Sequence, residues 1–146
     1  MSARPAQKLY TPELLGLATG LARFPLDDSL PLRAEARSRT CGSVIVLGLA
    51  LGEDGHIARI GMQVSACAIG QASGALLAQA AIGADPALVR LTGDGLALWL
   101  SGEAGLPDWP GLDALVAARD HPGRHGALLL PWKAAREALS SSAPPR

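Results

Sequence analysis

Aromatic side chains are scarce in this chain of 146 residues, where Trp, Tyr and Phe together make up only 3%. Hydrophobic residues are nevertheless 49% of the chain, so its core must be built from Leu, Val, Ile and Ala. Charge is also scarce, at 18% of residues with a formal net charge of zero. This balance argues against a nucleic-acid-binding protein, because phosphate recognition needs a basic surface, and it also argues against intrinsic disorder. The length fits a single domain over residues 1–146.

Long apolar runs and cysteines are lacking as well. The longest apolar run, 44–51, is far below the ~20 residues that cross a bilayer, so no membrane association is expected. Residues 1–8 contain no apolar segment typical of a signal peptide, and the predicted location is the cytoplasm. Two cysteines are too few for a disulfide framework, and pairing them with each other would require an oxidising compartment. In a reduced compartment each is inert packing, a nucleophile or a metal ligand.

The first half of the chain predicts a helix followed by a small sheet. Thr11 before Pro12 is typical of a helix start, and the helix is expected over 12–22. Gly48 is expected to weaken the central strand or to mark a bulge in it. The pair Asp54 and Gly55 is a hairpin signal that joins the last two strands. The predicted strands are an edge strand at 33–38, the clearest strand at 43–51, and a third at 56–64.

The second half of the chain predicts helices. A helical period runs from Cys67 to Ala81, and the three tryptophans are expected in the core. Strands followed by helices predict an α+β fold, in which a small antiparallel three-stranded sheet has helices packed on one face. The remaining predictions are short helices at 86–91, 95–100 and 110–118, a longer helix over 124–139 bent by Pro131, and a mobile tail at 140–146.

The two cysteines stand at positions where a thiol can be exposed. Cys41 precedes Gly42 in the turn between the first two strands, and Cys67 begins a helix. The positive end of a helix dipole favours a thiolate. The small residues after Cys67, at positions 68, 70, 72, 73 and 74, are interpreted as leaving room for a bulky group. Spacing alone does not bring the two sulfurs together, but both lie at ends of strands in one small sheet.

Three motifs in this order resemble the U-type iron–sulfur cluster assembly scaffolds, namely IscU, SufU and the N-terminal domain of NifU. Cys41-Gly42 matches the Cys-Gly-Asp of that family, and Cys67 to Ser73 matches its Cys-x-x-x-x-Ala-Ser. The stretch from Pro122 to Trp132 reads PGRHGALLLPW and resembles the family's Pro-x-Arg-x-x-Cys-Ala-x-Leu-x-Trp. The resemblance covers residues 9–139, and the Arg and Trp fit the SufU-like branch best.

Two ligand positions of the family are altered in this chain. Ser43 stands where the family has Asp, and Gly126 stands where it has the third Cys. His125 matches the histidine of the His-Cys pair in the IscU branch. The resemblance therefore implies a metal site of Cys41, Cys67 and His125, with the two cysteines also holding a cluster. Three ligands are one short of the usual four, so a partner or a small-molecule thiol is expected to complete the set.

The resemblance implies a scaffold-like binding protein rather than an enzyme. It would hold iron or a transient iron–sulfur cluster, accept sulfur from a cysteine desulfurase, and serve apo iron–sulfur proteins. One alternative is a zinc-dependent sulfur acceptor that builds no cluster, because two thiolates and a neutral imidazole bring Zn²⁺ to zero charge. A second alternative is a degenerate, metal-free family member that acts as an interaction or regulatory protein.

Overall fold

The computed structural model describes residues 9–39 and 42–140. Its elements are, in chain order, α1 (Pro12–Gly20), η1 (Leu21–Arg23), β1 (Leu32–Arg37), β2 (Val44–Leu51), β3 (Ile57–Ser65), α2 (Ala68–Ala81), α3 (Pro86–Leu100), η2 (Leu112–Asp120), η3 (Pro122–Arg124) and α4 (His125–Ser140). The η elements are 3₁₀ helices.

The three predicted strands form one antiparallel sheet in the order β1-β2-β3. The hairpin between β2 and β3 turns through Gly55, whose positive φ of 82° suits glycine. In β2 the side chains of Ile45, Leu47 and Leu49 are fully buried, which gives the sheet one apolar face. The predicted α+β class and the predicted sheet are therefore confirmed.

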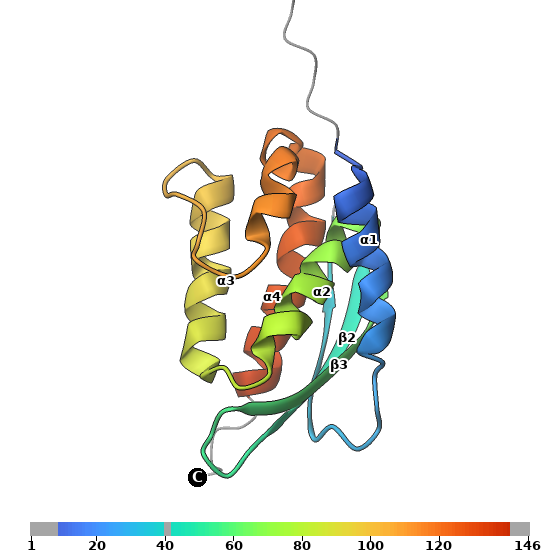
Figure 1. Cartoon of the computed structure of the whole chain (residues 1–146), viewed down its shortest axis with the longest axis vertical. Coiled ribbons are helices and arrows are strands. Elements are labelled where there is room, and N and C mark those ends of the chain that lie inside the picture. Colours follow the sequence, from blue (N-terminus) through green and yellow to red (C-terminus); the bar gives the residue numbers. More distant parts are fainter. Residues whose placement is uncertain (1–8, 40–41, 141–146) are drawn as a thin grey trace, which may run out of the picture.

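The helices gather on that apolar face (Figure 1). Both α2 and α4 pack directly on the sheet, α1 packs beside α2, and α3 packs on α4. The first helix begins as predicted, because the Thr11 side chain accepts a hydrogen bond from the Leu14 backbone N–H at 3.1 Å and Pro12 follows. One continuous core fills the space between the sheet and the helices.

Gly48 does not mark a bulge, contrary to the sequence interpretation. It pairs in regular register with Arg33 and Gly61, and the irregularity of β2 falls between Ala50 and Leu51 instead. A methyl group at Gly48 would lie 2.8 Å from the Cβ of Leu30, which is almost fully buried. The glycine therefore makes room for the loop before β1 on the outer face of the sheet.

The two short helices predicted at 86–91 and 95–100 are one continuous helix, α3. Its start follows the prediction, since the Asp85 carboxylate caps the backbone N–H of Ala87. The prediction was wrong in breaking the helix at 92–94, because these residues are helical and Gly93 and Gly95 both lie inside α3. A methyl group at Gly93 would meet the Cβ of Trp132 at 3.3 Å, and one at Gly95 would meet Pro107 at 3.0 Å. Close packing thus offsets the low helix propensity of glycine.

The last helix continues through Pro131 to Ser140, so Ser140 belongs to α4 rather than to the predicted tail. Residues 141–146 lie outside the described residues. The tryptophans 99, 109 and 132 are 3–4% exposed, as the core prediction requires. Within residues 9–39 and 42–140, no helix has the length and apolar character needed to cross a membrane.

Candidate functional site

The three segments that carry the motifs meet at one end of the sheet. The turn between β1 and β2 is closed where the Ser38 N–H donates to the Ser43 carbonyl at 2.9 Å. Val44, the first residue of β2, pairs with Ser65, the last residue of β3. The described ends of that turn, Arg39 and Gly42, therefore lie beside the corner that leads into Cys67. Cys41 itself lies outside the described residues.

Cys67 occupies the N-cap position of α2, as the sequence predicted. Its backbone is extended, with φ −66° and ψ 172°, and its side chain is half-buried against the core. The thiol makes no capping hydrogen bond within the part of the chain that the structure describes. The positive end of the α2 dipole favours negative charge at this position. Cys67 is therefore placed where a thiolate can bind a cation.

The start of α4 lies directly against the start of α2. A methyl group at Gly70 would meet Ala66 at 2.7 Å and the Ala127 carbonyl oxygen at 3.3 Å. Ala66 precedes Cys67, and Ala127 follows His125 and Gly126. The packing of two helix ends thus brings the second and third motifs into one neighbourhood, although 60 residues separate Cys67 from Ala127 in the chain.

His125 is held in one orientation by the backbone. Its ring Nε2 lies 2.8 Å from the carbonyl oxygen of Arg119. Because a carbonyl oxygen only accepts, Nε2 must carry the hydrogen, and the lone pair of a neutral ring is then on Nδ1. Metal-binding histidines commonly donate their second N–H to a backbone carbonyl in this way. The contact with Arg119 therefore sets the tautomer of the neutral ring, with Nδ1 as its unprotonated nitrogen.

The two altered positions differ in their surroundings. Ser43 is 3% exposed at the start of β2. Gly126 is partly exposed in the first turn of α4, and its φ is not positive, so the backbone there accommodates a side chain. With Pro122, Arg124 and Trp132 in register, however, the cysteine of the family pattern falls on Ala127, which is fully buried. The alignment of Gly126 with that cysteine is therefore wrong by one residue.

The small residues of α2 do not leave a space for a bulky group, contrary to the sequence interpretation. Ala66 and Ala127 occupy the space beside Gly70, and a methyl group at Gly74 would lie 2.9 Å from the Met62 sulfur. Residues of β3 and α4 occupy the space beside these glycines and pack closely against α2. The small side chains allow this contact instead of forming a ligand cavity.

Two motif residues serve the fold rather than the ligand set. The Ser73 hydroxyl is fully buried, donates to the Leu128 carbonyl at 2.6 Å, and accepts from the Trp132 indole Nε1 at 3.0 Å. Ser73 thereby links α2 to α4 close to the helix starts that carry the second and third motifs. The sequence interpretation missed this role, although the Ala-Ser and Trp of the motifs were the available signal.

The other two histidines are differently placed. His56 follows the hairpin turn, and its Nδ1 lies 3.1 Å from the Gly83 carbonyl, beyond the far end of α2. Fourteen residues of α2 separate Gly83 from Cys67, or about 21 Å of helix. His121 ends η2. Within the described ranges, no three His, Cys, Asp or Glu side chains form a group suited to a metal ion. The ligand set that includes Cys41 remains a prediction.

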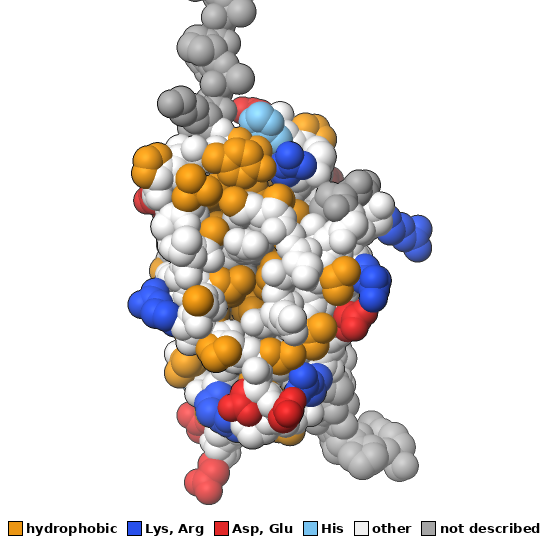
Figure 2. All heavy atoms as spheres, turned by 90° about the vertical axis from the view of Figure 1, so that its right-hand side faces the viewer, with side chains coloured by type: hydrophobic (Ala, Val, Ile, Leu, Met, Phe, Trp, Pro, Cys, Tyr) orange, Lys and Arg blue, Asp and Glu red, His pale blue; other side chains and the backbone are white. Residues whose placement is uncertain are grey.

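The surface near the starts of α2 and α4 has both apolar and charged parts. Hydrophobic side chains gather on the face that carries α1, with a histidine and a basic side chain at its upper end (Figure 2). Tyr10 is 41% exposed and Leu15 is 46% exposed. On the side of β1, a cavity of about 290 Å³ lies between Arg37–Arg39 and α4, and Gly126 forms part of its wall.

Solved structures with this fold are known. The N-terminal part of a nitrogen-fixing NifU-like protein from Brucella abortus superposes with a TM-score of 0.83 at 25% identity, covering 92% of this chain and 96% of that one. The chain is thus similar in fold to a U-type scaffold domain.

A second solved structure shares the fold at lower identity. It is a putative iron–sulfur cluster assembly scaffold protein for the SUF system from Fervidobacterium islandicum, with a TM-score of 0.77 at 19% identity. It covers 87% of this chain and 93% of the other. No protein-family model matches the chain, and no curated protein matches it significantly.

Proposed function

We propose that this protein is a scaffold for iron–sulfur cluster assembly, with iron and sulfur as its cargo. The observation that carries the proposal is the meeting of two helix starts at one end of the sheet. Cys67 caps α2 there, and His125 begins α4 with its Nε2–H committed to the Arg119 carbonyl. A thiolate and an oriented imidazole are a donor set for soft or borderline cations. Cys41, in the adjoining turn, supplies the second thiolate.

The protein acts by binding and transfer. Each thiol loses its proton to solvent as its sulfur binds the metal, and the open coordination position receives sulfide or a partner's ligand. We propose a cysteine desulfurase as the sulfur donor and apo iron–sulfur proteins as recipients. The desulfurase supplies sulfur as a persulfide, and two external thiols release its outer sulfur as sulfide while they are oxidised to a disulfide. The exposed Tyr10 and Leu15 near this end offer apolar contact area for such a protein. A cytoplasmic site of action accords with the chemistry of free thiols.

A zinc-dependent sulfur acceptor is the second candidate, and the absence of a cysteine from α4 is the observation that favours it. With no third cysteine in α4, the chain supplies three ligands, which is the number that zinc sites with an open position use. Such a site would hold Zn²⁺ and receive sulfur without building a cluster.

Anaerobic reconstitution with ferrous iron and sulfide separates these functions. We expect a visible absorption band that Cys67→Ser or His125→Asn reduces at least tenfold in yield. His56→Asn is the matched control, since His56 sits beyond the far end of α2. Stoichiometric zinc in the purified protein without a reconstitutable cluster would favour the zinc acceptor. Neither metal nor cluster, in a folded protein, would refute both and leave the metal-free interaction protein.

A further inference from the structure

Two small cavities lie on either side of the exposed residue Lys133 of α4. The first lies in the groove between α3 and α4 and has a volume of about 240 Å³, and the second lies between α4 and the end of β1 and has a volume of about 290 Å³. Both are smaller than the ~300–1,000 Å³ of typical small-ligand pockets. Because Lys133 lines both cavities, a ligand that fills them must cross α4. This arrangement suits an extended segment rather than a small molecule.

The charged residues that line the two cavities are nearly all cationic. Five are cationic and one, Asp94, is acidic. The five cations, named the basic face below, are Arg37, Arg39, Arg90, Lys133 and Arg136. Because the whole chain has a formal net charge of zero, this face gathers positive charge that the rest of the molecule balances elsewhere. Such a face attracts an anionic partner.

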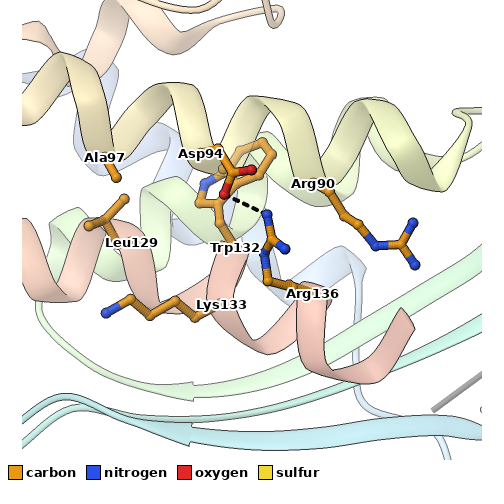
Figure 3. A pocket seen from close by; sticks show the side chains of 8 residues that line it. Arg90, Asp94, Ala97, Leu129, Trp132, Lys133 and Arg136 are labelled. Carbon is orange, nitrogen blue, oxygen red and sulfur yellow. Dashed lines mark hydrogen bonds and ion pairs between the residues drawn. The ribbon is translucent and has the colours of Figure 1, made fainter. Parts of the chain in front are cut away.

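Two members of the basic face are already paired within the chain. Figure 3 shows Arg136 reaching from α4 to Asp94 on α3, and Arg37 pairs with Glu35 at 2.9 Å. The other three cations make no ion pair with any residue in the ranges 9–39 and 42–140; they are Arg39, Arg90 and Lys133. Each cavity is thus lined by an arginine without an acidic partner in those ranges, and Lys133 lies between them.

Apolar surface lies beside these cations. In the groove between α3 and α4 it comes from Ala97, Leu129 and Trp132, and in the second cavity it comes from Leu130. A carboxylate can therefore pair with a cation while an apolar neighbour in the same ligand leaves water. A protein segment supplies both kinds of group, whereas the backbone of a nucleic acid presents phosphates and sugars.

The width of α4 sets the spacing of the acidic groups. An α-helix with its side chains is about 10–12 Å across, so the two cavities are separated by roughly that distance. In a polyproline II chain, which rises about 3.1 Å per residue, every third side chain lies on the same side, about 9 Å further along. Acidic side chains three residues apart in the sequence therefore match the two cavities.

We propose that the basic face docks an extended acidic segment of a partner protein, with carboxylates three residues apart. One carboxylate pairs with Arg90 in the groove between α3 and α4, the next pairs with Arg39 beside the end of β1, and Lys133 attracts both. No covalent bond forms. The proposal goes beyond the scaffold function, because docking here uses neither cysteine and no histidine.

Fluorescence anisotropy of a labelled peptide, titrated with the full chain at low ionic strength, tests the spacing. The probe has about twelve residues and repeats Glu-Leu-Gly, so at about 3.1 Å per residue it is long enough to cross both cavities. One control has the same composition with its glutamates in a single block, and another repeats Gln-Leu-Gly. We expect the probe to reach half-saturation at a concentration at least threefold lower than the block peptide and at least tenfold lower than the Gln-Leu-Gly peptide. Equal half-saturation by the probe and either control would overturn the proposal.

Substitutions locate the bound peptide. Lys133→Gln, Arg90→Gln and Arg39→Gln should each raise the concentration at half-saturation at least threefold. Arg23→Gln is the matched control, since Arg23 is exposed on η1, beside α1 and α2, and lines neither cavity. Circular dichroism of each variant separates loss of fold from loss of binding. If Arg23→Gln weakened binding as much as Lys133→Gln, any surface cation would serve and the proposal would be wrong.

Two further measurements fix the class of partner and separate this proposal from the scaffold function. A single-stranded oligonucleotide with as many negative charges as the probe should bind at least threefold more weakly, and equal or tighter binding would refute a protein segment. Cys67→Ser and His125→Asn should leave peptide binding unchanged, whether or not they abolish cluster reconstitution. A loss of peptide binding in either variant would overturn the assignment to the basic face.

Discussion

The buried bridge between α2 and α4 leads to a quantitative prediction for Ser73→Ala. The hydroxyl is fully buried and serves two partners, the Leu128 carbonyl at 2.6 Å and the Trp132 indole at 3.0 Å. Replacing it removes one atom, so the void is small. The substitution leaves the Trp132 N–H buried, because that side chain is 3% exposed.

The expected cost follows from those two interactions. An orphaned buried donor costs about 1–3 kcal/mol, and loss of the second hydrogen bond adds about 0.5–1.5 kcal/mol. Ser73→Ala should therefore lower the free energy of unfolding by about 2–4 kcal/mol. Urea unfolding followed by circular dichroism at 222 nm measures it. With a slope near 2 kcal/mol/M, the midpoint should fall by about 1–2 M.

Two comparisons test the reasoning itself. Thr92→Val removes a hydroxyl that is also buried but donates only to the Leu88 carbonyl within α3, and it should cost less than about 1 kcal/mol. In a Trp132→Phe background the orphaned donor is absent, so Ser73→Ala should cost less by about 1–2 kcal/mol. A cost for Ser73→Ala below that of Thr92→Val would refute the argument. Metal binding by the folded Ser73→Ala protein should be unchanged, because Ser73 serves the fold.

Three other outcomes are expected. Gly61→Ala should prevent stable folding, because its methyl group would lie 2.1 Å from the Pro25 carbonyl oxygen, and soluble yield with circular dichroism would show it. Gly16 lies inside α1, and a methyl group added there would have no neighbouring group within 4 Å. Gly16→Ala should therefore raise the free energy of unfolding, measured in urea, by up to about 1 kcal/mol, and a decrease would contradict the structure. The Ser29 backbone and hydroxyl groups lower the pKa of Asp27 below its ordinary 3.8. Its stabilising contribution is thus present above that value and lost as pH falls through the lowered one, so Asp27→Asn should flatten the acid limb of the stability–pH curve.

Local chemistry made much of the fold predictable from the sequence. Thr11 and Pro12 start α1 because a hydroxyl and a proline satisfy the free N–H groups of a helix end without any tertiary contact. The turn at Gly55 and the alternation of β2 depend on neighbours in sequence in the same way. Cys67 at a helix start was predictable for this reason, and so was its place at the end of a strand.

The role of each small residue was decided only by tertiary packing. Glycine carries no side chain, so its sequence context does not tell whether it breaks a helix, opens a cavity or admits a neighbour. Gly93 is helical because Trp132 packs on it, and Gly74 admits Met62, not a ligand. The approach of the start of α4 to the start of α2 was likewise decided by tertiary packing, because contacts between segments far apart in the chain depend on the complementary shapes of their surfaces.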